Sequence, residues 1–380
     1  MRIGVITLPL NTNYGGILQA YALQKVLTSL GHDVKTIDFN RIVNLPQSTK
    51  YLIYLKRAFL HYVMRKDIIV KPDVEENNLW KNRTRHTSKF IEKHIKRIEI
   101  KNISQIKENE FDCFVIGSDQ IWRHIYNNRF PGTQNAFLAF AESWDVKRIA
   151  YAASFGTDKW EYSQEDTFAC AKLAKRFDAI SVRESSAVNI CKEKLGVETC
   201  HLIDPTMLLE VEEYISLFQE QGTPQSTGNL MCYILDSNDD TSQIINDIAR
   251  YKNLVPFYTN SRTEDNNAPI EERIQPPVET WLRGFYDAEF VVTDSFHACV
   301  FSILFKKPFV VYGNNDRGMA RFTSLLQMFG LTDRLVETKE EAKEIATKAI
   351  NWNNVHELLQ KHRKKAFEFL YIHLKEDYLK

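Results

Sequence analysis

Short apolar runs alternate with longer amphipathic stretches over the first two hundred residues of the chain. The runs are rich in β-branched and aromatic residues and are bounded by polar or turn-forming ones, so each run predicts a strand. The expected strands are 2–7, 34–38, 111–116, 148–152, 179–182 and 201–203. Buried apolar strands that alternate with helices are typical of a parallel sheet covered by helices on both faces.

A second series of the same kind follows Asp204-Pro205, with expected strands at 230–235, 255–258, 290–293 and 309–312. A chain of 380 residues is also long for a single hydrophobic core. We therefore expect an α/β protein with an N-terminal domain at 1–205, a C-terminal domain at 206–350 and a helix at 351–380 that packs back on the domains. Ligands of such domains collect at the carboxyl ends of the strands, so a cleft between the domains is the expected site.

Charge and cysteine content narrow the class of protein. The 49 basic and 49 acidic residues balance, which argues against nucleic acid as a partner because there is no global positive field. The six cysteines form no C-x-x-C pair and are expected to be reduced thiols. No apolar stretch approaches the roughly 18 residues of a spanning helix, and the chain enters a strand without a charged leader. These features predict a cytoplasmic protein and specify no oligomeric state.

A glycine pair stands where the first strand turns into the first helix, in the segment Asn13-Tyr14-Gly15-Gly16. Glycines there allow the backbone to approach a ligand closely, and the free donors and dipole of the following helix favour an anion. The spacing matches neither the dinucleotide pattern G-x-G-x-x-G nor the Walker pattern. Two interpretations therefore stay open, an anion cradle and a plain strand-to-helix turn.

An acid and a histidine follow two other predicted strands. Asp119 comes just after the strand 111–116, where a carboxylate could accept a proton from a hydroxyl or anchor a sugar; the alternative is a helix cap. His297 falls in the first turn of a helix that Asp294 or Ser295 would cap. A helix N-terminus disfavours imidazolium, so this histidine indicates a nearby anion or a proton-transfer role, with a buried histidine bonded to a carbonyl as the alternative.

Three arginines also follow strand ends. Arg183 comes after the strand 179–182 and could bind a carboxylate or phosphate in bidentate fashion, unless it pairs with Glu184. Arg317 and Arg321 follow a strand of the second series and are expected at the same rim. A histidine, a carboxylate, several arginines and two helix N-termini suit a small polyanion beside a neutral hydroxylic partner.

Metal chemistry has weaker support. The acidic segment 236–240 is similar to the metal motif of some sugar-nucleotide enzymes, but a polar loop after a strand is the favoured interpretation because such matches are common. No histidine or cysteine group has zinc spacing. We expect no metal site.

The segment 50–66 is helical in length and amphipathic. On a helical wheel, one side is basic and consists of Lys50, Arg57, His61 and Arg65. The opposite side is apolar and consists of Leu52, Phe59, Leu60 and Val63. Such a helix can rest on a membrane surface. It can equally cover a sheet with its apolar side and leave its basic stripe in solvent, which is the commoner arrangement and the favoured interpretation.

Six motifs, taken in their order along the chain, resemble those of the polysaccharide pyruvyl transferase family. They run from residue 4 to about residue 330, and the set is far more specific than any single motif. The matching segments are Asn13-Tyr14-Gly15-Gly16 with Gln19-Ala20-Tyr21-Ala22-Leu23, Gly117-Ser118-Asp119-Gln120-Ile121-Trp122, Ala152-Ala153-Ser154-Phe155-Gly156, Ser181-Val182-Arg183-Glu184, Asp204-Pro205-Thr206 and Asp294-Ser295-Phe296-His297.

The resemblance implies a fold like that of the GT-B glycosyltransferases, in which two Rossmann-like domains face a cleft. It implies transfer of pyruvate from phosphoenolpyruvate, a donor substrate used without a cofactor, onto two hydroxyls of a sugar. The product is a cyclic ketal, and phosphate is released. The acceptor would be a polysaccharide precursor, and a lipid-linked precursor would bring the helix 50–66 to the inner face of a membrane.

Carried over by position, the resemblance implies that Arg183 and His297 contact phosphoenolpyruvate and that Asp119 is the acid of the cleft. With the other residues at the strand ends, this leads to the following hypothesis. His297 would be the catalytic acid and Asp119 the catalytic base. The donor would be bound by Arg183, Ser295, His297, Arg317 and Arg321, and the acceptor by Asn13, Tyr14, Gly15, Gly16, Asp119 and Gln120. One position departs from the family pattern, because Ser295 stands where an arginine often precedes the histidine by two residues. Arg321 or Arg317 would then supply the missing charge.

Two other functions stay open. A glycosyltransferase that uses a sugar nucleotide could have the same architecture, because fold alone does not specify chemistry. A non-catalytic relative that binds a sugar or an anion could have kept the cleft and lost the reaction, with Ser295 as the mark of that loss.

Overall fold

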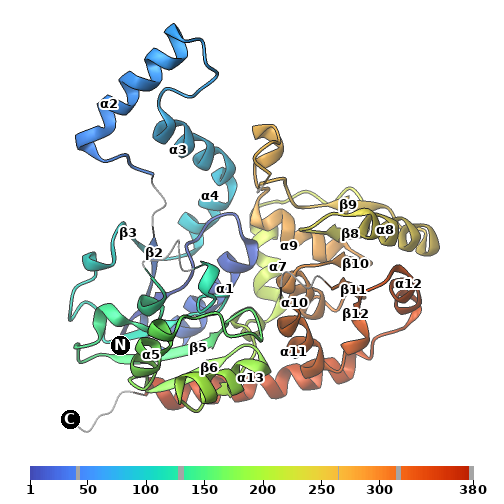
Figure 1. Ribbon diagram of the computed structural model, residues 1–380. Coiled ribbons are helices and arrows are strands. Elements are labelled where there is room, and N and C mark those ends of the chain that lie inside the picture. The colour runs from blue at the N-terminus through green and yellow to red at the C-terminus, as the bar shows by residue number, and fades with distance from the viewer. Residues whose placement is uncertain (40–42, 127–131, 264, 314–317, 376–380) are drawn as a thin grey trace.

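The computed structural model describes residues 1–39, 43–126, 132–263, 265–313 and 318–375, which fold around two parallel sheets (Figure 1). Within these residues the first sheet has seven strands in the order β3-β2-β1-β4-β5-β6-β7, and all pairs are parallel. Its strands are β1 (Arg2–Ile6), β2 (Asp33–Phe39), β3 (Arg97–Ile100), β4 (Cys113–Ile116), β5 (Lys147–Ala153), β6 (Ala179–Val182) and β7 (Cys200–His201).

The second sheet has, over the same described ranges, five parallel strands in the order β12-β11-β10-β8-β9. Its strands are β8 (Leu230–Tyr233), β9 (Pro256–Tyr258), β10 (Phe290–Thr293), β11 (Phe309–Tyr312) and β12 (Leu335–Val336). The predicted α/β fold with parallel sheets is confirmed, and each expected strand overlaps an observed one. The two further strands, β3 and β12, lie at sheet edges, where a continuous apolar run is not required.

Helix α1 (Tyr14–Ser29) is buried on almost all sides. Its N-cap is Asn13, whose side-chain oxygen accepts a hydrogen bond from the Gly16 N–H at 3.3 Å. The helix contacts β2 of the first sheet, the turn at Pro205–Leu208 and α10 (Phe296–Leu304) of the second half. Its first turn therefore lies where the two halves of the molecule meet.

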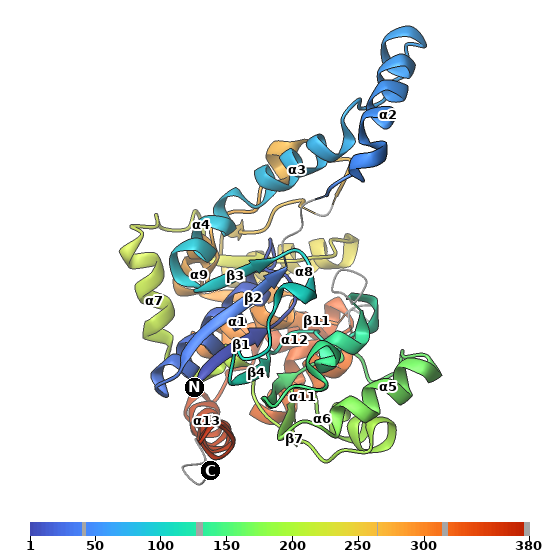
Figure 2. The ribbon, with the colours of Figure 1, turned by 90° about the vertical axis from the view of Figure 1, so that its left-hand side faces the viewer.

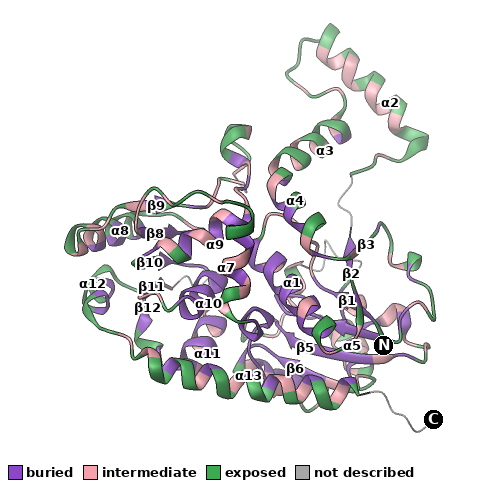
Figure 3. Cartoon of the chain, turned by 180° about the vertical axis from the view of Figure 1, so that it is seen from behind, coloured by how far each residue is buried: buried purple, intermediate pink, exposed green. Residues whose placement is uncertain are grey.

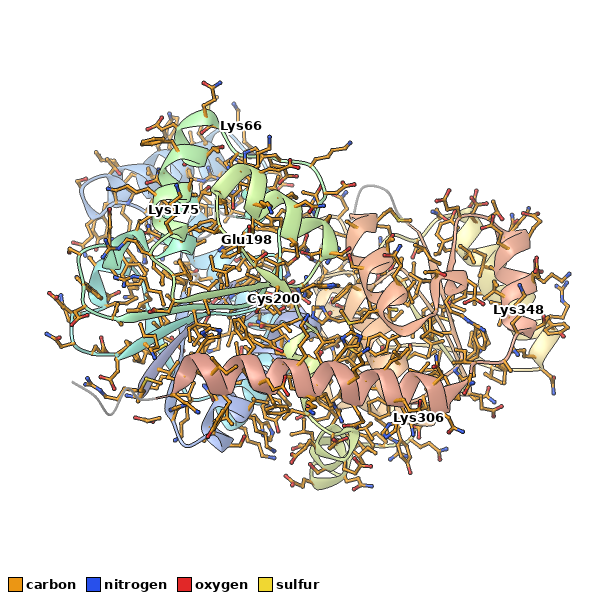
Figure 4. The ribbon with its side chains drawn as sticks, turned by 90° about the horizontal axis from the view of Figure 1, so that it is seen from below. Lys66, Lys175, Glu198, Cys200, Lys306 and Lys348 are labelled. Atoms are coloured by element: carbon orange, nitrogen blue, oxygen red, sulfur yellow. The ribbon has the colours of Figure 1, made fainter. Side chains whose placement is uncertain are left out.

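The last helix, α13 (Trp352–Leu374), runs beneath both sheets, from the side where Lys348 is labelled toward the first sheet (Figure 4). Nε of Arg363 on this helix donates a hydrogen bond to the Met207 carbonyl at 2.7 Å. The Phe369 ring lies 6.3 Å from the Tyr151 ring of β5. The helix also contacts α11 (Met319–Phe329), so it packs on elements of both halves.

Helix α2 (Gln47–Ala58) covers neither sheet. Figures 1 and 2 both show it projecting from the body at the end of α3 (Pro72–Arg83), and Figure 3 shows its residues exposed or half-buried. No residue of this fully described helix is buried. The favoured interpretation of the segment 50–66 is therefore wrong. Its apolar side faces solvent, and its basic side is the one that contacts the rest of the chain.

Candidate active site between the two sheets

A cleft of about 1970 Å³ lies between the two halves of the molecule. Its walls come from segments that follow β1, β2 and β4 of the first sheet and β8, β9 and β10 of the second. These are the carboxyl ends of parallel strands, where ligands of such sheets bind. Helix α3 and α4 (Arg85–His94) add a side wall that includes Trp80 and Arg83.

The glycine pair of α1 lies between two ionisable side chains from opposite halves of the cleft. A Cβ atom built on Gly15 would lie 1.9 Å from Nδ1 of His297, so the imidazole rests directly on the backbone of the first helical turn. A Cβ atom on Gly16 would lie 3.4 Å from Oδ2 of Asp119. The close approach that glycine permits is thus used by His297, and the histidine and the carboxylate meet neighbouring residues of one helical turn.

Asp119 reaches the cleft through an uncommon backbone conformation. Its φ of 63° lies in the left-handed region, which aspartate tolerates better than most residues. Strained residues of this kind collect at functional sites. The residues directly after Asp119 form turns and no α-helix, so the alternative interpretation as a helix cap does not hold. The side chain is buried in the cleft wall.

An ion cluster lies behind these two side chains. Oδ2 of Asp204 lies 2.8 Å from Nη1 of Arg183 and 3.5 Å from Nε2 of His297. The first pair is hydrogen-bonded, and the second is an ion-pair separation that is long for a hydrogen bond. Oδ1 of Asp204 accepts hydrogen bonds from the Thr206 N–H at 3.0 Å and hydroxyl at 2.7 Å. Asp204, which our site prediction did not include, is therefore a fixed carboxylate that faces His297.

The members of this cluster shift one another's pKa values. Burial opposes the charge of Asp204, but His297 and Arg183 outweigh it and lower the pKa of that carboxyl below its usual range. Burial likewise opposes the charge of Arg183, but Asp204, Glu184 and Asp119 raise its pKa. Both groups are therefore charged at neutral pH.

Arg183 lies beneath the cleft. Its side chain is 2% exposed, because the ring of Phe296 covers the guanidinium with 4.4 Å between the ring centroid and Cζ. Its Nη2 lies 3.8 Å from Oδ1 of Asp119, and its Nε lies 3.6 Å from Oε1 of Glu184. We expected Arg183 to contact the donor directly, but its side chain lies behind Phe296 and does not line the cleft. Arg183 instead acts on the cleft through Asp119 and Asp204.

The two residues before α10, Asp294 and Ser295, have different hydrogen-bond partners. Asp294 accepts hydrogen bonds from the N–H groups of Leu235 at 2.7 Å and Asp236 at 2.8 Å, so it holds the loop after β8. Ser295 is the N-cap residue by position, but its side chain makes no capping hydrogen bond. Its own N–H donates to Oγ1 of Thr293 at 3.0 Å. Both residues line the cleft.

Arg321 brings a cation close to this motif. It lies in the first turn of α11 and lines the cleft, with its Cζ 5.6 Å from the centroid of the Phe296 ring. Burial, reinforced by the charge of Arg183, lowers the pKa of Arg321 to about 10. Two guanidinium groups therefore share one phenyl ring, and an anion bound in this region would lower the free energy of both. Arg317 lies outside the described residues.

The residues expected to bind an acceptor divide into two groups. Asn13, Gly15, Gly16, Asp119 and Gln120 line the cleft. Tyr14 does not, because its buried hydroxyl donates a hydrogen bond to the Pro276 carbonyl at 2.8 Å, with the Thr259 carbonyl at 3.3 Å. Tyr14 therefore fastens α1 to the second half of the molecule.

Among the charged cleft residues that our site prediction does not include are Asp38, Arg97 and Arg123. Asp38 accepts hydrogen bonds from the Leu10 N–H at 3.0 Å and from Nη1 of Arg97 at 2.6 Å. Arg123 donates from Nη1 to Oε1 of Gln120 at 2.9 Å. The available signal for Asp38 is an acid near the carboxyl end of an apolar strand, and Arg123 directly follows a recognised motif. Arg97 lies on the edge strand β3, which the apolar pattern does not reveal.

The acidic segment 236–240 supports the favoured interpretation as a polar loop and helix start. Asn238 caps α8 (Asp239–Lys252), where its side chain accepts a hydrogen bond from the Thr241 N–H. Across the described ranges no three histidine, cysteine, aspartate or glutamate side chains are placed to hold a metal ion. No helix in that same part of the chain is long and apolar enough to cross a bilayer.

A family model described as polysaccharide pyruvyl transferase matches residues 13–316, which is well over half of the chain. The chain belongs to the polysaccharide pyruvyl transferase family. The matched range includes the glycine pair, Asp119, Arg183, Asp204 and His297. A comparison with curated proteins gives no sequence match.

Solved structures show the fold. The UDP-GlcNAc 2-epimerase from Neisseria meningitidis bound to UDP-GlcNAc is 10% identical, with a TM-score of 0.50 over 98% of this chain and 100% of that chain. The UDP-GlcNAc 2-epimerase from Methanocaldococcus jannaschii is 11% identical, with a TM-score of 0.50 over 98% and 100%. The expected GT-B-like fold is confirmed. At these identities the likeness concerns the fold alone.

Proposed function

We propose that this protein transfers pyruvate from phosphoenolpyruvate onto two hydroxyls of a sugar, with formation of a cyclic ketal and release of phosphate. Family membership supports the reaction class. The observation that carries the assignment is the placement of His297 and Asp119 beside Gly15 and Gly16, from opposite halves of the cleft. An acid beside an anion and a base beside a neutral alcohol are what this reaction needs.

Two hydroxyl protons are removed in the reaction, and one proton is delivered to carbon. His297 protonates the methylene carbon of phosphoenolpyruvate, which becomes a methyl group, while the first hydroxyl adds to the neighbouring carbon and gives its proton to Asp119. The second hydroxyl then displaces phosphate as the carbon–oxygen bond to phosphate breaks, and its proton leaves with the phosphate. Proton transfer from Asp119 to His297 through solvent restores the site. No oxidation or reduction takes place, and no cofactor is required.

The donor would bind beside Arg321 and the N-terminus of α10, which both border the cleft. Arg321 supplies a guanidinium for the carboxylate or phosphate, and the N-terminus of α10 adds the positive end of a helix dipole. Arg321 thereby takes the place of the arginine that Ser295 replaces. Arg183 supports this potential from beneath, and Asp204 holds His297 in position without contact to the donor.

The acceptor would bind along the opposite wall. Asn13 and Gln120 offer amide groups, Asp38 offers a carboxylate, and Trp80 offers an aromatic ring on which a sugar can stack. This wall continues along α3 toward the projecting helix α2. A polysaccharide precursor made in the cytoplasm, free or linked to a lipid, is the acceptor class that we propose.

The test is phosphate release from phosphoenolpyruvate in the presence of sugars and lipid-linked oligosaccharides, with mass analysis of the products. His297→Ala should lower turnover by about 10²- to 10⁴-fold, while the protein stays folded. His356→Ala, a histidine exposed on α13, should keep full activity. A His297→Ala variant that keeps more than about a tenth of the activity would remove this residue from proton transfer.

Two further measurements, incubation with sugar nucleotides and binding of phosphoenolpyruvate, distinguish the two alternative functions. Release of a nucleoside diphosphate from a sugar nucleotide would identify a glycosyltransferase on this fold. Binding of phosphoenolpyruvate without turnover across the acceptor panel would identify a non-catalytic relative.

A further inference from the structure

The projecting arm, which we define as residues 47–71, carries an exposed apolar stripe. It consists of α2, the short helix Phe59–Val63 that continues it, and the segment that leads to α3. The side chains of the stripe are between 56% and 74% exposed and are Tyr51, Leu52, Leu55, Phe59, Tyr62 and Val63. They recur at spacings of three and four residues, so they share one side of the helix.

The opposite side of the arm is held against α3 and the segment before it. Nζ of Lys50 lies 2.9 Å from Oδ2 of Asp73, and the Tyr54 hydroxyl donates to Oδ1 of the same carboxylate at 2.5 Å. Nε of Arg57 donates to the Ile69 carbonyl at 2.6 Å. Because polar contacts fix this side toward α3, the apolar stripe is held outward.

The arm is also cationic. Residues 47–66 contain five lysines and arginines and no aspartate or glutamate. Since the whole chain has 49 basic and 49 acidic residues, the remainder has five more acidic than basic residues. The rest of the arm, residues 67–71, adds Asp67 and Lys71 and leaves this net charge unchanged. Four of the arm's cations, Lys56, Arg65, Lys66 and Lys71, are exposed. The arm therefore differs in sign from the rest of the molecule.

We propose that the arm docks this protein on an anionic lipid bilayer, with the apolar stripe among the headgroups and the exposed cations beside lipid phosphates. The stripe supplies apolar area, the cations supply attraction to anionic lipid, and Tyr51 and Tyr62 have the amphipathic rings that favour the interface. A second copy of the arm is a poor occupant, because two arms with five positive charges each would repel one another. The net acidic remainder keeps the body off an anionic surface, so the arm makes the contact.

This docking would place the cleft beside the bilayer. Helix α3 joins the arm to the cleft, and its Trp80 and Arg83 line the cleft wall. Its 12 residues span about 18 Å, so the cleft opening would lie about one helix length above the docked arm. If the proposed function holds, a sugar acceptor attached to a lipid of that bilayer would reach the cleft opening. The docking itself does not depend on pyruvyl transfer.

The test is flotation of the full-length protein with vesicles of phosphatidylcholine, with or without phosphatidylglycerol. We expect binding to the anionic vesicles, with weakening at high salt. The double variant Leu55→Ser/Phe59→Ser should bind at least about tenfold more weakly. Its thermal unfolding and its activity on a soluble acceptor should equal those of the natural protein. Lys56→Glu/Lys66→Glu should lose the preference for phosphatidylglycerol. The matched control is Tyr371→Ser/Ile372→Ser, at equally exposed apolar positions of α13, which should bind as the natural protein does.

Absence of binding to anionic vesicles would overturn the proposal, as would equal loss of binding in the α13 control. A dimer in light scattering that Leu55→Ser/Phe59→Ser dissociates would assign the stripe to a second copy of the chain and also overturn it. The vesicle measurements do not require pyruvyl transfer activity. A negative result in the transfer assay would therefore refute the proposed function and not the membrane docking.

Discussion

Replacing Gly15 by alanine perturbs the contact between α1 and His297 directly. The added Cβ would lie 1.9 Å from Nδ1 and 2.2 Å from Cγ of the imidazole. Cβ contacts below 3.0 Å are essentially never seen, so the ring has to retreat by about 1 Å or more, or the two halves of the cleft have to separate. The retreat is resisted, because His297 is buried with Asp204 on its other side.

Two effects of opposite sign set the change in stability. Forced overpacking costs about 1–3 kcal/mol, whereas alanine in place of glycine within a helix gains up to about 1 kcal/mol. We expect a net loss of about 1 kcal/mol in the free energy of unfolding. The loss of activity should be much larger, because a misplacement of about 1 Å in a catalytic group can cost about 100-fold in rate.

The assay compares turnover and urea unfolding of Gly15→Ala with those of Gly16→Ala. The neighbouring substitution is a matched control, since its Cβ would lie 3.4 Å from the nearest atom, Oδ2 of Asp119. It should therefore keep most of the activity and equal or exceed the natural stability. If the two variants have the same turnover, the imidazole does not depend on the glycine contact and the reasoning is refuted.

Three further substitutions test other parts of the site. The lowered pKa of Asp204 means that its ionised form stabilises the fold above the ordinary aspartate pKa of about 4 and that this contribution is lost as the pH falls below it. Asp204→Asn should thus lower the free energy of unfolding by about 3 kcal/mol at pH 7 and by less at pH 3, as measured by urea unfolding. A loss that is the same at both pH values would contradict the ion cluster. Tyr14→Phe should cost about 1 kcal/mol by the same measurement, because the half-buried Pro276 carbonyl loses its donor. An unchanged midpoint would show that this hydrogen bond contributes nothing to stability. Arg321→Lys keeps the charge but loses the planar fork, so the KM for phosphoenolpyruvate should rise about tenfold at similar kcat; an unchanged KM would place the donor elsewhere.

The apolar pattern predicts most of the fold for a physical reason. Strands of a parallel sheet are buried on both faces, so runs such as Phe290–Thr293 and Phe309–Tyr312 are continuously apolar and easy to recognise. Edge strands are half covered, and β3, with its Arg97 and Glu99, has no such run. The acidic residue Asp38 could have been noticed as a charge inside an apolar strand, whereas Arg97 could not.

The site was predictable as a set of residue types at strand ends, but the partners of each residue were not. Asp119, His297 and the glycine pair all lie in or beside the cleft. Arg183 follows a strand end in the same way, yet Phe296 from the other half covers it. Whether a residue at a strand end meets ligand or protein depends on what the opposite domain places over it.

By itself the sequence determined the two series of buried strands, the family and the residue types of the cleft, because burial and motif spacing are local properties of the chain. Only the tertiary structure decided that Gly15 makes room for His297, that Asp204 faces that histidine and that Tyr14 joins the two halves. It also decided the direction of the arm. A helical wheel separates the apolar side of 50–66 from the basic side, but only the contacts of Asp73 with Lys50 and Tyr54 turn the apolar side outward. These outcomes depend on contacts between distant segments, and local periodicity carries no information about them.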